Sequence, residues 1–379
     1  MVKETIDFVR AHYESEKFIP LHEPYFAGKE KDYLNECIDT TFVSSVGKFV
    51  DKFEEDIARF TGANYAIATV NGTAALHIAL QLAGVLQEDE VITQSLTFIA
   101  TCNAISYIGA HPIFVDVDQA TMGLSPEKLK HFLTNEAIMI NGQCVNKSTK
   151  RIIKAVVPMH TFGMPINLDD LKTVCDSYNI KIVEDAAESL GSYQNNKHTG
   201  TKGLFGTLSF NGNKTITTGG GGMIITNDEA LAKKAKHITT TAKIPHRWDF
   251  NHDQVGYNYR MPNINAALGC AQLENLPEIL KNKRDLALKY NVFFNDKPAR
   301  FVTEPENTTA NYWLNAIVLD NALERDEFLT ATNNAGVMTR PIWKLMSGLP
   351  MFQKAQKGNL ENSIWLEERV INIPSSVKR

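Results

Sequence analysis

Residues 65–86 have the sequence YAIATVNGTAALHIALQLAGVL, in which an apolar run, a glycine turn and a helical segment follow one another. The run Tyr65–Thr69 is typical of a β-strand, and Gly72 lies in the turn after it. The segment Thr73–Leu86 places apolar side chains, Leu76 among them, around a largely buried helix. This strand–turn–helix unit indicates an α/β fold.

The same alternation continues along the chain. Helix-like stretches separate further runs with strand character, and one such stretch, Asn167–Tyr178, begins at a residue that favours helix N-termini. The strand-like runs are Glu90–Thr93, Pro112–Asp116, Ile152–Pro158, Lys181–Glu184, Thr207–Phe210 and Met223–Thr226. Such alternation predicts a mostly parallel sheet with helices on both faces.

The pattern changes after Pro262. Longer amphipathic stretches, a strand-like run and a further helix follow, at Ile264–Leu276, Pro277–Phe294, Leu314–Leu319 and near Glu324–Asn334. We therefore predict a large α/β domain over residues 36–261 and a smaller α+β domain over 262–379, with residues 1–35 packed against the smaller one. The polar stretch Thr134–Arg151 is predicted to be a surface excursion between two sheet strands.

Composition excludes several classes of protein. Among 379 residues, 43% are hydrophobic and 22% charged, which is typical of globular proteins rather than disordered or fibrous ones. The net charge of −4 provides no general attraction for nucleic acid or anionic membranes. Five dispersed cysteines without a C-x-x-C pair indicate reduced thiols and no metal site. The charged N-terminus lacks the apolar core of a secretory signal. We expect a cytoplasmic protein that binds neither nucleic acid nor membrane.

Ligands of open α/β sheets bind beyond the carboxyl ends of the strands, so the residues that follow each strand are the candidates for chemistry. Gly72, Thr73 and Ala74 follow the first strand, where the free N–H groups of a helix start can hold a phosphate. An ordinary βα turn has the same sequence pattern.

Asp185 follows the strand-like run Lys181–Glu184 and can either pair with a protonated ring nitrogen of a cofactor or cap the next helix.

A lysine lies in the glycine-rich stretch SFNGNKTITTGGGG, residues 209–222. Lys214 follows a strand, and a partly desolvated lysine loses its charge readily and can form a Schiff base. The alternative is an ordinary surface lysine. Neither a Walker A loop nor a dinucleotide fingerprint fits this stretch. The stretch GYNYRMP, residues 256–262, is either part of a site or ordinary packing.

Six motifs occur in the order NGTAAL, SLTFIATCNAI, PIFVDVD, EDAAESLGS, SFNGNKTITTGGGGMI and GYNYRMPNINAALG. With them the chain resembles, from Pro20 to about Pro374, the DegT/DnrJ/EryC1/StrS family of sugar aminotransferases, which depend on pyridoxal 5'-phosphate (PLP). The resemblance implies the type I, aspartate aminotransferase-like fold. It also implies an enzyme of transaminase type that alternates between PLP and its amino form, PMP.

The resemblance assigns roles to single residues. Lys214 attaches PLP through its amine and then moves a proton to and from the substrate carbon, while Asp185 binds the pyridinium nitrogen. The phosphate is held at the helix start by Gly72, Thr73 and Ala74, together with the Ser209 hydroxyl. A related group of enzymes that removes a sugar hydroxyl has histidine at the lysine position, so Lys214 favours amino transfer.

Three further residues have implied positions near the cofactor. Phe98 stacks on the ring, and Asn258 reaches the phosphate from the other subunit of a homodimer with shared active sites. Glu188 stands near the phenolic oxygen, where many members of the family have Gln or His.

The resemblance also implies the substrates. L-glutamate is the amino donor, and the acceptor is a nucleotide-linked keto sugar. The motif forms resemble most those enzymes that aminate C4 of UDP-linked 4-keto-6-deoxy-N-acetylhexosamines, in legionaminic acid or bacillosamine pathways for lipopolysaccharide, O-antigen or other surface glycans. GDP-perosamine synthases share GNKTITTG and are the alternative. Candidate substrate contacts are His160, His237, Arg247, Tyr259 and Arg260, and an ordinary packing role is the alternative for each of them.

Two hypotheses of other classes stay open at this point. A PLP-binding regulatory protein without turnover would keep Asp185 and the phosphate loop but lose Lys214. A nucleotide-binding structural protein would carry no PLP and therefore show no visible absorbance.

Overall fold

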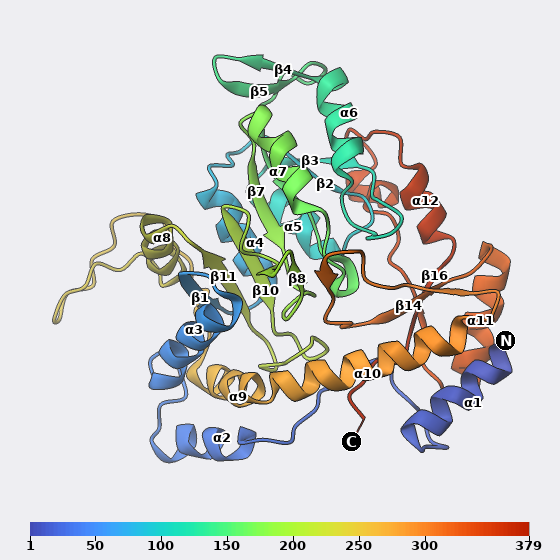
Figure 1. Ribbon diagram of the computed structural model, residues 1–379. Helices are drawn as coiled ribbons and strands as arrows, with labels where there is room; N and C mark the ends of the chain where they lie inside the picture. The colour runs from blue at the N-terminus through green and yellow to red at the C-terminus, as the bar shows by residue number, and fades with distance from the viewer. Residues whose placement is uncertain (379) are drawn as a thin grey trace.

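A computed structural model describes residues 1–378, and its centre is a seven-stranded sheet in the order β1-β11-β10-β7-β6-β2-β3 (Figure 1). The strands are β1 (Tyr65–Thr69), β2 (Glu90–Gln94), β3 (His111–Val115), β6 (Ile153–Val157), β7 (Lys181–Asp185), β10 (Phe205–Ser209) and β11 (Gly222–Thr226). Only β11 runs antiparallel to its two neighbours. The predicted mostly parallel sheet is therefore confirmed, with each strand within two residues of its expected bounds.

Helices cover both faces of this sheet because neighbouring apolar residues of the buried strands point to opposite sides. Val183 and Ile224 pack on one face against α4, α5 and α8. Ile182 and Ile225 pack on the other face, where α6 and α7 cover one half of the sheet and α3 and α9 the other. The site can therefore form only at an edge of the sheet.

The helices within residues 1–378 are α1 (Val2–Tyr13), α2 (Glu30–Asp39), α3 (Lys48–Thr61), α4 (Gly72–Leu82), α5 (Ile99–Tyr107), α6 (Pro126–Glu136), α7 (Leu168–Ser177), α8 (Glu229–Thr239), α9 (Asn263–Glu274), α10 (Leu276–Phe294), α11 (Ala322–Asn334) and α12 (Glu361–Glu367). Helix α4 ends earlier than predicted because Gly84 has a left-handed φ of 87°. Asn167 caps α7 as expected, by accepting a hydrogen bond from the Asp170 amide. No helix within these residues is both long and apolar enough to cross a membrane.

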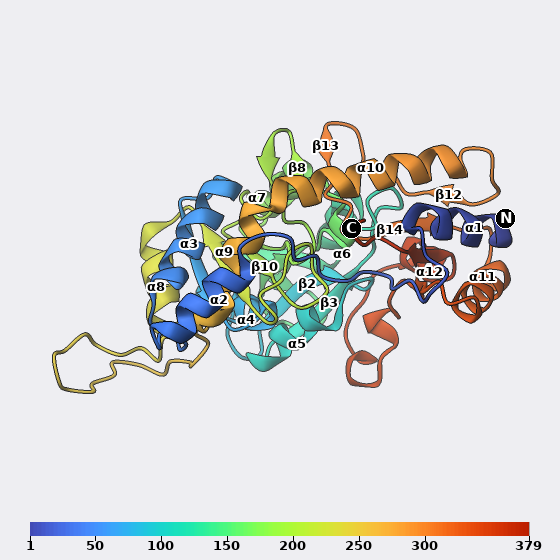
Figure 2. The same cartoon turned by 90° about the horizontal axis from the view of Figure 1, so that it is seen from below.

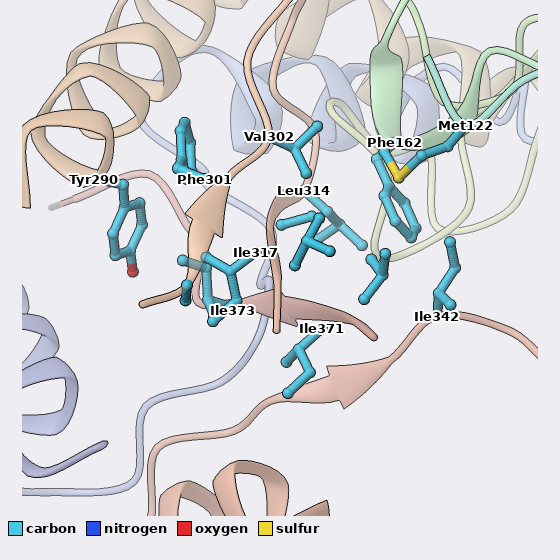
Figure 3. Packing of buried hydrophobic residues seen from close by; sticks show 14 of the residues in the cluster. Met122, Phe162, Tyr290, Phe301, Val302, Leu314, Ile317, Ile342, Ile371 and Ile373 are labelled. Carbon is cyan, nitrogen blue, oxygen red and sulfur yellow. The ribbon is translucent and has the colours of Figure 1, made fainter. Parts of the chain in front are cut away.

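A second, four-stranded sheet has the order β12-β14-β16-β15. Its strands are β12 (Arg300–Phe301), β14 (Asn315–Val318), β15 (Arg340–Pro341) and β16 (Val370–Ile373). Side chains of this sheet pack with α10, α1 and α11 in one buried cluster, part of which Figure 3 shows. Helix α10 extends from the first sheet's side of the molecule to the second (Figure 2).

Helix α9 lies on the large sheet's side of the molecule. Its side chains Ala266, Ala267 and Cys270 belong to the same buried cluster as Phe53 of α3. The N-terminal segment divides in a similar way, because α1 contacts α11 whereas α2 contacts α9. The division of the chain into domains at residue 262 stays a prediction, and these contacts favour a boundary further along, within α10.

The stretch Thr134–Arg151 forms a hairpin of β4 (Ala137–Ile140) and β5 (Gln143–Asn146) that projects from the molecule (Figure 1). Its tip is exposed, as expected for a surface excursion. Its second strand is anchored, because Cys144 is buried and the Asn146 side chain donates to Glu90 over 2.7 Å. A small three-stranded sheet joins β8 (Tyr193–Gln194), β9 (Lys197–His198) and β13 (Thr308–Thr309).

Candidate active site

The candidate site lies at one edge of the large sheet, where the parallel strands end. Asp185 is the last residue of β7 and Ser209 the last residue of β10, and these two strands pair in parallel. The antiparallel strand β11 begins at the same edge, where Gly222 lies opposite both Ser209 and Thr69. The fold therefore brings together residues that are up to about 150 positions apart in sequence.

A cavity of about 300 Å³ opens at this edge. Seven of the nine residues for which we predicted roles at the cofactor line it: Gly72, Thr73, Phe98, Asp185, Glu188, Ser209 and Lys214. The other lining residues are Asn71, Leu76, Ala100, Met159, Ala187, Asn211, Asn213, Gly221, Trp313 and Trp343. Ala74 and Asn258 are not among them.

The N-terminus of α4 faces this cavity. Asn71 caps the helix by accepting a hydrogen bond from the Ala74 amide over 2.8 Å, so Ala74 supports the turn from within. The amides of Gly72 and Thr73 precede any intrahelical partner and stay available to an anion. Gly72 also packs closely on Ser209, whose hydroxyl oxygen lies 3.3 Å from the place of an added Cβ.

Position 222 requires a glycine, because the backbone at the start of α4 lies very close to it. An added Cβ there would lie 2.4 Å from the carbonyl of Asn71 and 2.6 Å from the Gly72 amide nitrogen. We expect Gly222→Ala to displace the helix start, lower the free energy of unfolding by about 1–3 kcal/mol, and weaken the binding of PLP. Thermal unfolding and a PLP titration measure both effects. Gly220→Ala is the matched control, since nothing lies within 4 Å of its added Cβ, and an equal loss in both variants would contradict the packing.

Asp185 is a buried carboxylate with few partners. Its Oδ2 accepts a hydrogen bond from the Thr101 hydroxyl over 2.6 Å, and its Oδ1 accepts one from the Ala187 amide over 3.2 Å. Burial raises the pKa of Asp185, and those two donors and the Lys214 charge lower it only in part. A buried carboxylate of this kind gains from pairing with a protonated nitrogen.

Lys214 and Glu188 are the other charged side chains that line the cavity, besides Asp185. Lys214 Nζ lies 3.1 Å from Glu188 Oε1 and 4.0 Å from the centre of the Trp313 ring. The other carboxylate oxygen of Glu188 accepts a hydrogen bond from the Phe162 amide over 2.9 Å. The lysine amine is thus held inside the cavity, with an ion-pair partner on one side and an aromatic face on the other.

Burial raises the pKa of Glu188 to about 7, and the nearby Lys214 charge opposes this shift. Because its pKa is higher in the folded protein than in the unfolded chain, the native state binds more protons between about pH 4.5 and 7. Glu188 therefore stabilises the fold fully at low pH, and this contribution is lost as pH rises through about 7.

We expect the unfolding midpoint of Glu188→Gln, measured without PLP, to fall less between pH 5 and pH 8 than that of the wild type. Calorimetry at four pH values would measure the slope. Glu361→Gln is the control, because Glu361 is exposed and its pKa is lowered, so its titration lies below this window. An unchanged slope in Glu188→Gln would contradict the assigned pKa.

The site contains aromatic residues that the sequence interpretation missed. Trp313 is buried, donates from Nε1 to the carbonyl of Asn213 over 2.6 Å, and so packs beside the lysine loop. Trp343 lies 6.2 Å from Phe98, ring centre to ring centre. Trp313 and Trp343 come from beyond residue 300, and only the rarity of tryptophan, with four in the chain, could have drawn attention to them.

Buried polar groups behind Trp313 hold it in place. The Asn311 amide donates to the carbonyls of Glu188 and Leu190 over 2.9 Å each. Lys283, which is fully buried on α10, donates from Nζ to the carbonyl of Trp313 over 3.1 Å. Burial lowers the pKa of Lys283 to about 7.

His160 does not reach the cavity. It is fully buried and hydrogen-bonds from Nε2 to Glu184 over 3.1 Å. Burial acts to raise the pKa of Glu184, but His160 and the amides of Gly203 and Gly200 outweigh it and hold this pKa low. In this structure the His160 side chain belongs to a buried hydrogen-bonded pair with Glu184, so its predicted substrate contact stays a prediction.

The other predicted contacts lie on or near a long loop after α8, which projects from the molecule (Figures 1 and 2). Asn258 is exposed and accepts a hydrogen bond from Arg260 Nε over 3.0 Å. His237 pairs with an aspartate, Arg247 packs on Trp248, and the Tyr259 hydroxyl lies 3.3 Å from a ring nitrogen of His77. None of them lines the cavity within one chain, so their roles stay predictions.

Comparison with known proteins agrees with this geometry. A sequence profile described as the DegT/DnrJ/EryC1/StrS aminotransferase family matches residues 24–378. The chain belongs to this family. GDP-perosamine synthase of Escherichia coli O157:H7 is 38% identical over 361 residues, which are 95% of this chain and 93% of the relative. The putative pyridoxal phosphate-dependent aminotransferase EpsN of Bacillus subtilis (strain 168) is 37% identical over 340 residues, 89% of this chain and 85% of the relative.

The fold is also that of solved aminotransferases. The aminotransferase TlmJ from Streptoalloteichus hindustanus superposes with a TM-score of 0.85 at 25% identity, covering 94% of this chain and 93% of that one. The predicted family, the type I fold and the aminotransferase class are therefore confirmed.

The cavity of this family member fits PLP on its own structural grounds. Asp185, a carboxylate that is 3% exposed and has no ion-pair partner within residues 1–378, lies at one point of the lining. A helix N-terminus with free amides lies at a second point, and a lysine amine at a third. In this order, the three groups complement the protonated ring nitrogen, the phosphate and the aldehyde carbon of PLP.

Proposed function

We propose that this aminotransferase moves the amino group of L-glutamate to C4 of a nucleotide-linked 4-keto-6-deoxy sugar. Its cofactor is pyridoxal phosphate, which alternates with PMP. The observation that carries the proposal is the placement of Lys214, Asp185 and the N-terminus of α4 around one cavity. When bound, PLP supplies the electron sink that lets a proton leave the carbon next to the amine.

Each residue of the chain has a separate task in this reaction. Asp185 would hold the ring nitrogen in its protonated form, because a buried carboxylate favours a positive partner. The amides of Gly72 and Thr73 and the hydroxyl of Ser209 would hold the phosphate. The Phe98, Trp313 and Trp343 rings give this cavity aromatic walls.

Proton movement falls to Lys214 and Glu188. The Lys214 amine would take a proton at Nζ from one carbon and return it to another. Glu188, 3.1 Å away, has a pKa of about 7 and can therefore hold a proton or release it near neutral pH. This pairing gives Glu188 a role that the sequence left open.

Relatives favour a particular acceptor. GDP-perosamine synthase, at 38% identity, supports a GDP-linked 4-keto-6-deoxyhexose as the sugar. The UDP-linked 4-keto-6-deoxy-N-acetylhexosamine expected from the motif forms is the second candidate. In either case the product would be an amino sugar for surface glycans such as O-antigen, made in the cytoplasm.

We also propose that two copies form the site together as a homodimer. Large apolar side chains are exposed on residues 42–46 and on the loop after α8, where Phe250 is 77% exposed. Asn258 lies at the base of that loop and also faces outward.

Mixing two inactive variants, Lys214→Ala and Asn258→Ala, tests whether Asn258 serves the partner's site. If it does, mixed dimers contain one intact site and should recover part of the activity. If each site is formed by one chain alone, the mixture stays inactive.

Absorbance spectroscopy of the PLP-loaded protein tests the proposed reaction. L-glutamate should remove the visible band by converting PLP to PMP, and the correct keto sugar should restore it. The GDP-linked and UDP-linked candidates are compared in separate cuvettes. Restoration by neither sugar would contradict the proposed acceptors, and a band that ignores glutamate would contradict the donor.

A further inference from the structure

A second cavity, of about 480 Å³, lies beside the candidate active site. We call it the side cavity. It shares Asn213, Trp313 and Trp343 with the lining of the first cavity, so the two cavities are adjacent. Phe162 and Ile342, which Figure 3 shows within the buried cluster, form part of its apolar wall.

The charged residues of the side cavity are Arg325, Asp326, Arg340, Lys344 and Glu367. Arg325 lies 2.7 Å from Asp326, and Lys344 lies 3.5 Å from Glu367. Arg340 donates instead to two neutral oxygens, of the Asn333 side chain and the Thr339 carbonyl. It forms no ion pair with a residue of the described chain, 1–378. The lining therefore carries one positive charge without a balancing carboxylate.

A buried amide lies next to this arginine. Asn372 of β16 is the direct partner of Arg340 of β15, so their side chains share one face of the small sheet. Ile371 and Ile373 project to the other face, into the packed cluster of Figure 3. Asn372 is 3% exposed and lines the side cavity, yet its amide nitrogen has no hydrogen-bond partner among residues 1–378. Buried amides are rarely left unpaired without a reason.

We propose that the side cavity binds a carboxylate of the amino donor, with the Arg340 guanidinium and the Asn372 amide donating to its oxygens. This inference rests on the proposed function. One unbalanced positive charge matches one carboxylate, and both neighbouring donors then gain acceptors. A diphosphate brings more negative charge into a lining that already contains Asp326 and Glu367, so the carboxylate is the better match.

Calorimetry with glutarate tests the site, because this dicarboxylate has no amine and cannot react. The PLP-loaded wild type should bind it, and Arg340→Met should bind it at least about 10-fold more weakly, the loss expected for a charged hydrogen-bonding partner. Arg300→Met is the matched control, since Arg300 is exposed like Arg340 but lies at the opposite edge of the same sheet, outside the side cavity. Equal affinities in Arg340→Met and Arg300→Met would overturn the proposal.

Asn372→Leu separates a ligand role from a structural one. Because the amide nitrogen has no partner within the described part of the chain, its removal should leave the unfolding midpoint unchanged or raise it, while glutarate binding weakens. A large drop of the midpoint with normal glutarate binding would show that Asn372 serves the fold, and would overturn its assignment to the donor.

Measuring the two half-reactions separately shows whether the side cavity binds the carboxylate of the amino donor or the diphosphate of the sugar nucleotide. Arg340→Met should slow PLP consumption by L-glutamate at subsaturating concentrations and leave the reaction of the PMP form with the keto sugar unchanged. The opposite pattern would place the diphosphate in the side cavity and overturn the proposal. If the wild type ignores glutamate altogether, the proposed donor fails, whereas glutarate affinity still reports on Arg340 and Asn372 as a carboxylate site.

Discussion

Replacement of Lys214 by alanine should lower turnover by at least about 10³-fold, since the variant loses both the amine that holds the cofactor and the base that moves the proton. The fold should survive, because Lys214 lies in a loop and its ion pair with Glu188 is not part of the apolar core. Coupled assay of 2-oxoglutarate release from glutamate in the presence of the keto sugar would measure the loss.

Lys202→Ala is the matched control for this variant. Lys202 is another largely buried lysine with a carboxylate partner, Asp169 at 2.8 Å, but it lies outside the cavity. We expect it to keep most of the activity. Turnover in Lys214→Ala within 10-fold of Lys202→Ala would contradict the assignment of the catalytic amine.

Asp185→Asn should lower turnover by about 10²- to 10³-fold, the effect of removing one preorganised electrostatic partner from a buried site. The substitution keeps the size of the side chain. Its one amide oxygen can still accept from the Ala187 amide, and its NH2 group can donate to the Thr101 hydroxyl. It removes the negative charge that would keep the ring nitrogen protonated. Rates of the glutamate half-reaction in stopped flow, with circular dichroism as a check on folding, would measure the effect.

Asp116→Asn provides the comparison for a buried aspartate with a purely structural role. Asp116 is 1% exposed and accepts from the amides of Asn362 and Ser363, away from the cavity. This variant should lose stability and keep its rate per folded molecule. An Asp185→Asn enzyme with normal half-reaction rates would show that the ring nitrogen needs no charged partner here.

Much of the site was predictable because its residues follow strands. Asp185 and Ser209 end adjacent parallel strands, so the topology of an α/β sheet places them at one edge once those strands are recognised. Lys214 lies in the connection between β10 and the antiparallel strand β11, which begins at Gly222. Recognition of the strands therefore places these positions near one edge of the sheet, whereas their expected roles come from the family resemblance.

The remainder of the site depends on tertiary contacts that have no local pattern. Trp313 and Trp343 come from segments beyond residue 300 and line the same cavity as Lys214. Asn311 and Lys283 of α10 hydrogen-bond to the backbone of Trp313. His160 shows the opposite case, since a residue that follows a strand can also turn inward to a buried partner. Only the packed structure separates these two outcomes.

Fold boundaries show the same limit. The periodicity of residues in α9 and α10 predicts two helices. It does not predict that α9 packs against α3, which covers the large sheet. An amphipathic pattern indicates which face of a helix is buried, but it does not indicate which element that face packs against. The predicted boundary at residue 262 therefore followed a change of pattern rather than a change of packing partner.

Borohydride reduction followed by peptide mass spectrometry tests the central assignment most directly. The PLP-loaded protein is reduced, digested and mapped, so that any lysine joined to the cofactor keeps it as a stable adduct. We predict a single adduct on Lys214, in the peptide that contains residues 209–222. An adduct on another lysine, or a fully loaded protein with none, would contradict the placement of the cofactor in this cavity.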